Sequence, residues 1–245
     1  MHQEGKVKRL RRTVPTLAAL VLVGAFCGLG IWQLYRADVK RELQAEYDRR
    51  ATQAPLRVGA EVQPVEALQF YRVEARGVYD VGYQVLLDNR VHQGVVGYHV
   101  LTPLRIDGAD TRVLVNRGWV PLGGDRARLP VIDPPAGSVS VSGIATVPRD
   151  GLSLGAPPPL ARERPTVWAQ LDLAQYARAV PFAVQPVVIL LDPQSTAGGY
   201  ARHWARLDAG IAVHQGYAFQ WFALAAAVLV IYVVLTVRAV RRGDR

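Results

Sequence analysis

Two long apolar runs stand near the ends of the chain, and neither contains a charged residue. The first covers Val14 to Tyr35, 22 residues, and the second covers Ala218 to Val237, 20 residues. A helix rises about 1.5 Å per residue, so each run is long enough to cross a hydrocarbon core of about 30 Å. Lipid cannot satisfy backbone N–H and C=O groups, which makes a helix the expected form. We therefore predict transmembrane helices over residues 14–35 and 218–237.

The segment between the two runs has the pattern of a β-rich domain. Short stretches rich in Val, Ile, Leu and Tyr are separated by turn residues such as Asp107-Gly108. Connections of a few residues favour antiparallel pairing, because a parallel crossover needs a longer segment. Asp172 to Val180 predicts a short helix that Asp172 caps and that ends before Pro181. The predicted strands are Tyr71–Val78, Tyr83–Asp88, Gly97–Leu104, Arg112–Val115, Val139–Thr146 and Val187–Leu191.

These elements predict an α+β membrane protein. Two transmembrane helices flank one domain, residues 36–217, which is a mainly antiparallel β-sheet with minor helix. Residues 1–13 and 238–245 form the remaining tails.

Charge indicates how the chain is oriented in the membrane. Residues 1–13 carry a net charge of +4 and residues 238–245 a net charge of +3, out of +9 for the whole chain. Basic residues beside membrane spans remain cytoplasmic. We therefore predict a multi-pass protein of the cell (inner) membrane with both termini cytoplasmic and the central domain outside, in the periplasm of a two-membrane bacterium. Because each basic cluster adjoins an apolar run, the charge indicates contact with membrane lipid and no nucleic-acid binding.

The composition argues against several kinds of chemistry. Cys27 is the one cysteine, which excludes an intramolecular disulfide, a Cys-rich metal cluster and a C-x-x-C-H haem attachment. The five histidines form no H-E-x-x-H motif of a hydrolytic zinc site. Gly151 to Gly155 matches G-x-S-x-G, but the prolines that follow cannot continue the helix that a nucleophile elbow needs. We expect no enzyme activity and no catalytic residues.

One histidine stands where the chain returns to the second apolar run. His214, Tyr217 and Trp221 are spaced to share one face of a helix, and Trp32 and Arg36 lie at the same end of the first run. One interpretation is an aromatic belt, since Trp and Tyr rings favour the headgroup region. The other is a site for a flat hydrophobic ligand. In such a site His214 would ligate iron, the aromatic rings would pack on the ligand's faces and Arg36 would pair with its carboxylates.

The central domain contains the sequence Asn-Arg twice, each time after an apolar strand. The residues concerned are Arg90 in the first copy and Asn116, Arg117, Gly118 and Trp119 in and after the second. Arginine is a fork-shaped donor. These residues therefore either tie loops together or bind a carboxylate or the acidic surface of a partner, and the sequence leaves both alternatives open.

These motifs, taken in order, resemble the Surfeit locus protein family of cytochrome c oxidase assembly factors. The resemblance runs nearly end to end and also includes the two-helix topology. One departure is Val213, where the family often has an asparagine that would be a hydrogen-bond partner near the histidine. The matching segments are Gly30-Ile-Trp-Gln-Leu-Tyr-Arg36, Gly77-x-Tyr79, Asn89-Arg90 with Gly94, Gly97 and Tyr98, Thr102-Pro-Leu104, Val115-Asn-Arg-Gly-Trp-Val-Pro121 and His214-Gln-Gly-Tyr-Ala-Phe-Gln-Trp-Phe222.

The resemblance implies a non-catalytic role in maturing the haem–copper oxidase. The expected cofactor is haem a, received from haem a synthase or passed to the catalytic subunit of the oxidase, which are the implied partners. His214 is the implied ligand of the haem iron, with Trp32, Arg36, Tyr217 and Trp221 around it. The alternative is a membrane-anchored scaffold that stabilises an oxidase assembly intermediate without binding haem.

Overall fold

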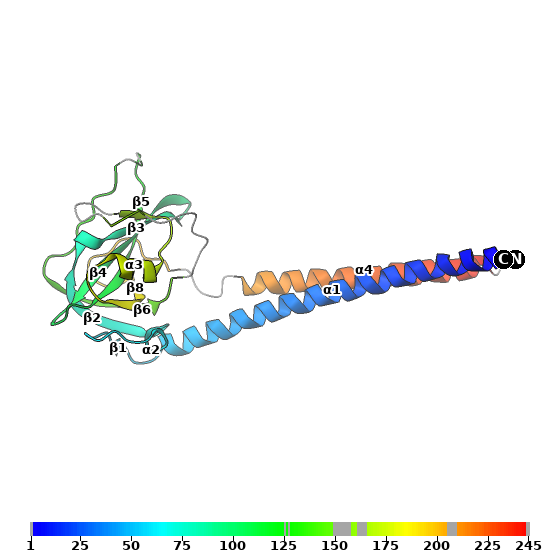
Figure 1. The fold of residues 1–245 in the computed structure, drawn as a ribbon, viewed down its shortest axis with the longest axis horizontal. Coiled ribbons are helices and arrows are strands. Elements are labelled where there is room, and N and C mark those ends of the chain that lie inside the picture. Colours follow the sequence, from blue (N-terminus) through cyan, green and yellow to red (C-terminus); the bar gives the residue numbers. More distant parts are fainter. Residues whose placement is uncertain are drawn as a thin grey trace. The chain divides into compact units, whose positions relative to one another are not determined.

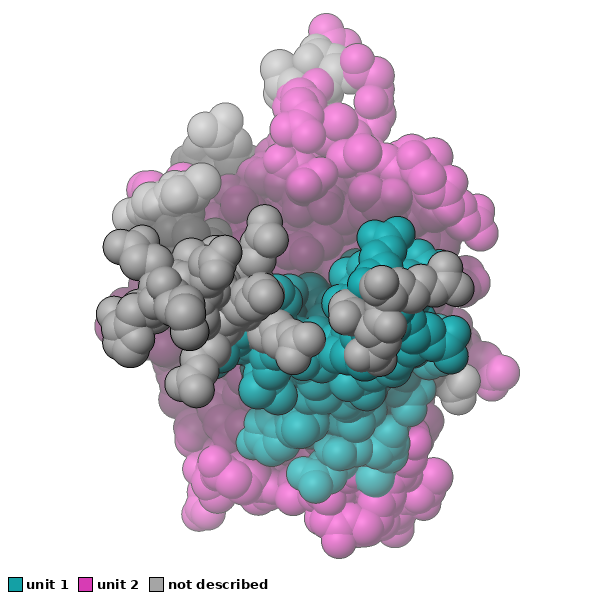
Figure 2. Space-filling view, turned by 90° about the vertical axis from the view of Figure 1, so that its right-hand side faces the viewer, with its two compact units in different colours: residues 1–45, 206–245 teal, residues 46–205 magenta. Residues whose placement is uncertain are grey.

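The structure is a computed structural model that describes residues 2–124, 126, 128–148, 158–160, 166–204 and 210–243, with side chains from Thr13 to Arg242. The chain forms two compact units, Met1–Ala45 with Arg206–Arg245, and Glu46–Ala205, coloured separately in Figure 2. In chain order the elements are α1 His2–Ala51, β1 Leu56–Arg57, α2 Val65–Leu68, β2 Arg72–Tyr79, the 3₁₀ turn η1 Val81–Tyr83, β3 Val85–His92, β4 Val95–Ile106, β5 Arg112–Pro121, β6 Ser138–Thr146, β7 Thr166–Trp168, α3 Leu173–Ala179, β8 Val184–Leu191 and α4 Ile211–Gly243 (Figure 1).

The first unit is a pair of long helices. α1 and α4 lie side by side and run in opposite directions, so the start of α1 and the end of α4 lie at the same end of the pair (Figure 1). Thr13–Ala51 and Ile211–Arg242 are both long and apolar enough to cross a membrane. The two apolar helices that the sequence predicts are therefore present. The membrane boundaries at residues 14–35 and 218–237, and the side on which each tail lies, remain predictions.

The second unit is built on one sheet that closes on itself. The strand order is β1-β2-β6-β8-β5-β4-β3-β7, and β2 also pairs with β4. The strands β2, β6, β8, β5 and β4 therefore form a ring, which is a small barrel. Gly77 lies at the closure, since it is opposite Val139 of β6 and Ile106 of β4. A Cβ atom on Gly77 would lie 1.9 Å from the carbonyl oxygen of Arg105. Only glycine therefore fits at this crossing.

The prediction of a mainly antiparallel sheet is right for most strand pairs and incomplete for the whole sheet. Neighbours along the chain, such as β3–β4 and β4–β5, pair antiparallel. Three pairings are parallel: β1–β2, β3–β7 and β5–β8. β5 and β8 are separated by β6, β7 and α3, so the connection is long enough for a parallel crossover. The prediction considered only short connections and missed these pairs.

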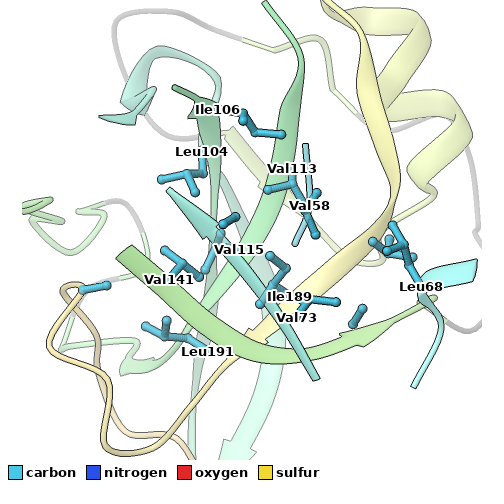
Figure 3. Packing of buried hydrophobic residues seen from close by; sticks show 14 of the residues in the cluster. Val58, Leu68, Val73, Leu104, Ile106, Val113, Val115, Val141, Ile189 and Leu191 are labelled. Carbon is cyan, nitrogen blue, oxygen red and sulfur yellow. The ribbon is translucent and has the colours of Figure 1, made fainter. Parts of the chain in front are cut away.

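The main hydrophobic core fills the inside of the barrel. Alternate residues of each ring strand point inward, as Val113 and Val115 of β5 do, and they meet Ile189 and Leu191 of β8 (Figure 3). A second core lies on the other face of β5, where Leu114 packs with Trp168 and Tyr176. β5 is therefore buried on both faces, which explains why Val113, Leu114 and Val115 are all apolar.

The predicted short helix is confirmed as α3. The Asp172 side chain accepts a hydrogen bond from the backbone N–H of Gln175 over 2.8 Å, as an N-cap should. Tyr176 on α3 is fully buried and donates its hydroxyl hydrogen bond to the carbonyl of Tyr83 over 2.9 Å. α3 thereby covers the outer face of the barrel.

Candidate functional site

Small residues line the contact between α1 and α4 in the first unit. Gly30 and Ala37 of α1 are buried, as are Ala218 and Ala225 of α4. A Cβ atom on Gly30 would lie 2.7 Å from the ring of Phe222, so the ring occupies the space that glycine leaves. Small residues let two helix backbones approach closely where the hydrophobic effect cannot drive association, as in lipid.

The same contact contains two polar pairs between the helices, Thr16 with Tyr232 and Gln33 with His214. The Nδ1 atom of His214 and the Oε1 atom of Gln33 are 2.7 Å apart. An amide oxygen can only accept, so Nδ1 of His214 carries the proton. In a neutral imidazole the second nitrogen, Nε2, then keeps its lone pair free to bind a metal. The structure therefore supplies His214 with a hydrogen-bond partner from the other helix, although Val213 stands where the family often has asparagine.

One aromatic pair lies two helical turns from this histidine along the same helix contact. The rings of Phe26 and Trp221 are stacked with their centroids 5.7 Å apart, and both side chains are partly buried. Trp221 follows His214 by two helical turns, and Phe26 precedes Gln33 by two turns, so both pairs lie along the same helix contact. Gln33 and Phe26 were not among the predicted site residues. A glutamine inside an uncharged apolar run was the signal that could have indicated Gln33.

The other predicted site residues lie on more open faces of the helices. Trp32 is 53% exposed and Tyr217 is 49% exposed, and Arg36 is also exposed. Within the described residues neither Trp32 nor Tyr217 makes a ring contact with another aromatic side chain. The structure thus brings His214 and Trp221 into the helix contact and leaves Trp32, Tyr217 and Arg36 at its margin.

In the second unit, Arg117 is at the end of the barrel core. Its side chain is 1% exposed, its Nε donates to the carbonyl of Gly198 and its Nη2 to the carbonyl of Asp133, both over 2.9 Å. Arg117 therefore ties two loops together, which is one of the two roles that the sequence left open. A buried guanidinium is not available to the surface of a docked protein.

The residues after Arg117 fix the same loop. Gly118 has φ of +119°, and a Cβ atom there would lie 2.8 Å from the carbonyl oxygen of Ala201. The backbone N–H of Trp119 donates to that carbonyl over 2.7 Å. Asn116 is buried, and its Oδ1 accepts from the N–H of Gly118 over 3.2 Å. This segment needs glycine because L side chains rarely adopt this conformation and would have no room here.

Trp119 joins β5 to the hairpin of β3 and β4. Its Nε1 donates to the carbonyl of Arg90 over 2.7 Å, and Arg90 in turn donates through Nη2 to the carbonyl of Ala169 over 3.2 Å. The ring of Trp119 lies 5.1 Å from that of His92, which lies 5.0 Å from the ring of His203. The structure thus brings Arg90 and Trp119 together. Their hydrogen bonds connect separate segments and hold this part of the domain in shape.

His99 lies in the same region and is partly buried. Its Nδ1 is 3.4 Å from Nδ2 of Asn116, and its ring lies 5.7 Å from Trp204. Burial, together with the nearby charges of Arg90 and His92, lowers the pKa of His99 to about 4. His99 is therefore neutral at physiological pH. No group of three His, Cys, Asp or Glu side chains among the described residues is placed to hold a metal ion.

The segment Gly151 to Gly155 lies outside the described residues. The other sequence motifs considered above lie within them.

Comparison with known proteins gives a family match over most of the chain. A model of the SURF1 family matches residues 20–226. The chain is 25% identical to a SURF1-like protein of Monosiga brevicollis over 222 residues, which covers 85% of this chain and 82% of that protein. It is 26% identical to Surfeit locus protein 1 of Mus musculus over 85% of this chain and 71% of that protein. A SURF1-like protein of Dictyostelium discoideum is 34% identical over 38% of this chain and 37% of its own length.

Proposed function

Because this chain belongs to the SURF1 family, we propose that it is a membrane-anchored assembly factor for haem–copper cytochrome c oxidase that binds haem a through His214. It would hand the haem to the catalytic subunit of the oxidase. The observation that carries this proposal is the hydrogen bond from Nδ1 of His214 to Gln33, because it leaves Nε2 as the nitrogen that can bind iron.

The residues at the helix contact fit a haem in chemical type. A haem iron accepts an imidazole nitrogen as an axial ligand, and the macrocycle is flat and apolar with carboxylates at one edge. His214 would supply the nitrogen, Trp32 and Tyr217 would pack against the macrocycle, and Arg36 would pair with a carboxylate. Trp221, held by Phe26, would support the apolar side of the site. Half-exposed aromatic rings are expected of a carrier that must later release its ligand.

Gln33 has a defined task in this proposal. By accepting the Nδ1 proton it keeps the imidazole in one tautomer and one orientation before the ligand arrives. Hydrogen-bond partners of metal-binding histidines typically change metal affinity by about 10- to 100-fold. In this proposal His214 is an oriented ligand and not only a member of an aromatic belt.

The test is to purify the full chain from cells that make haem a and to measure its haem. The absorption spectrum and a pyridine haemochrome assay give the content and type. We expect the wild type to carry haem a and His214→Ala to lose most of it, whereas His203→Ala, an exposed histidine of the other unit, should keep it. Equal haem content and an equal Soret band in His214→Ala and wild type would sink the proposal.

A second candidate is a scaffold that stabilises an oxidase assembly intermediate without binding haem. The half-exposed rings of Trp32 and Tyr217 support it, because such rings also serve as anchors at the headgroups. This candidate requires that oxidase subunits copurify equally with His214→Ala and wild type. It also requires that they are lost when Trp119 is replaced in a variant that still folds. If the oxidase subunits no longer copurify with His214→Ala, the scaffold candidate is contradicted.

A further inference from the structure

A cavity of about 710 Å³ lies in the second unit, at the point where β1 and β4 diverge along one edge of β2. The pairing of β1 with β2 ends before Ala75, and the pairing of β4 with β2 begins after Arg76. The segment Arg57–Ala60 lines one side of this gap, and Ile106 and Asp107 line the other. The volume is within the range of about 300–1,000 Å³ that is usual for small-molecule sites.

Side-chain hydrogen bonds hold the wall of the cavity in place. The fully buried Gln185 donates to the carbonyls of Gly59 and Glu61 over 3.2 and 2.7 Å, and the hydroxyl of Thr111 donates to the carbonyl of Ala60. A Cβ atom added to Gly59 would have nothing within 4 Å. The wall is therefore fixed on its inner side and has open space beside it.

The apolar part of the lining is aliphatic. Val58, Ile106 and Val141 belong to the barrel core and reach the cavity at its edge (Figure 3). Ala60 and Ala75 complete this part of the wall, and the described lining residues include no aromatic side chain. Flat ring ligands are usually held by aromatic side chains, which stack on their faces. This wall instead suits a short branched aliphatic group.

The rim of the cavity holds one cation and one anion side by side. Arg57 and Glu74 both line it, and they are register partners on neighbouring strands, which lie about 4.8 Å apart. Within the described chain neither side chain forms an ion pair or a hydrogen bond. Arg76, which also lines the cavity, is by contrast paired with Asp107 at 3.4 Å. The two charges that remain available are therefore of opposite sign.

We propose that this cavity is a binding site for a branched aliphatic α-amino acid. The carboxylate of the ligand pairs with the guanidinium of Arg57, its ammonium group pairs with the carboxylate of Glu74, and its side chain lies against Val58 and Ile106. One carbon atom carries both charges of an α-amino acid, as the two adjacent side chains require. A simple carboxylic acid would be repelled by Glu74 and a simple amine by Arg57. The site lies wholly in the second unit and does not depend on haem binding.

The test is isothermal titration calorimetry of the full chain in detergent with L-leucine, L-isoleucine and L-valine. At least one of them should bind saturably. Three analogues each lack one recognised group: L-leucinamide lacks the carboxylate, 4-methylpentanoate lacks the ammonium group and glycine lacks the aliphatic side chain. Each analogue should bind at least tenfold more weakly. Absence of saturable binding by all three amino acids, or equal binding of leucine and any analogue, would overturn the proposal.

Arg57→Gln should weaken leucine binding at least tenfold and remove the preference for leucine over leucinamide, because the partner of the carboxylate is lost. Loss of that preference is the decisive result, since it identifies the contact and is not expected of general damage to the fold. Arg178→Gln is the matched control, because Arg178 is exposed on α3 away from the lining, and it should bind like wild type. An unchanged preference in Arg57→Gln would refute the assignment of Arg57.

Gly59→Leu should block the cavity by filling it. The new side chain enters open space, so the domain should fold with an unchanged Tm while leucine binding is lost. Gly124→Leu is its control, since Gly124 also has nothing within 4 Å of an added Cβ atom and does not line the cavity. Wild-type affinity in Gly59→Leu would show that leucine binds elsewhere and would contradict the proposal.

Discussion

His214 donates a hydrogen bond from Nδ1 to Oε1 of Gln33 across 2.7 Å, and the two residues are 181 positions apart in the chain. The hydrogen bond joins the two long helices, and it also fixes the tautomer of the imidazole. Both residues lie in the helix contact to which Gly30, Ala37, Ala218 and Phe222 also belong. Both side chains are partly buried, so replacing one leaves the other without its hydrogen-bond partner in a setting that water reaches less easily.

Gln33→Leu should weaken haem binding without removing it. Leucine cannot accept the Nδ1 proton, so the imidazole loses its fixed tautomer, and we expect about a 10-fold loss of affinity. Haem titration of the purified full chain, followed at the Soret band, measures this loss. Gln220→Leu is the control, since Gln220 lies exposed on α4 and should leave the affinity unchanged. Equal losses in both variants would show that general polarity and not this bond matters.

Gly77→Ala should destabilise the second unit strongly. The new methyl group would meet the carbonyl of Arg105 at 1.9 Å, in backbone that cannot move without opening the barrel. Overpacking of this kind costs about 1–3 kcal/mol, and we expect the upper end. Chemical denaturation followed by tryptophan fluorescence measures the free energy of unfolding. Gly59→Ala has nothing within 4 Å of the added carbon and should change stability little. A similar effect of both substitutions would contradict the barrel closure at Gly77.

Acid should destabilise the domain through His99. Its pKa is about 4 in the folded chain, below the ordinary 6.5, so between these values only the unfolded chain takes up the proton. The contribution of His99 to the free energy of unfolding is complete above pH 6.5. It falls as the pH is lowered towards 4 and changes no further below that pH. The shift corresponds to at most about 3 kcal/mol. Denaturation at pH 7.5 and pH 4.5 measures it.

His99→Gln should flatten this pH dependence. His203→Gln should retain it, because His203 is exposed and is not among the charges that shift the pKa of His99. A pH dependence unchanged by His99→Gln would assign the acid sensitivity to another group.

Gln185→Leu should release the segment that precedes α2. Gln185 is fully buried, donates to the carbonyls of Gly59 and Glu61 over 3.2 and 2.7 Å, and accepts from the N–H of Gln63 over 3.1 Å. Leucine leaves these backbone groups without a partner, at about 1–3 kcal/mol for each that stays buried. Faster amide hydrogen exchange near residue 63 and a lower Tm are expected. Gln194→Leu, at an exposed position, serves as the control and should leave both measurements unchanged.

The local elements were predictable because each leaves a periodic trace. An uncharged run of 22 residues can hardly be anything but a long apolar helix, and apolar-rich runs bounded by turn residues gave β2 and β6 to within about one residue of their observed limits. The motifs around Arg117 and His214 were also enough to indicate the family, which the match over residues 20–226 confirms. The end of β5 was missed, because Asn116 to Pro121 has the composition of a turn.

Tertiary structure alone decided which distant segments meet. Periodicity shows which face of an element is buried but not what buries it, so the parallel pairing of β5 with β8, and with it the barrel, had no local signal. For the same reason the sequence could indicate His214 but not Gln33 as its partner. It could mark Arg117 as a donor but not show that two of its nitrogens hold loops while the third remains free of acceptors within the described chain. Such contacts depend on the packing of the whole chain, which no single stretch of residues determines.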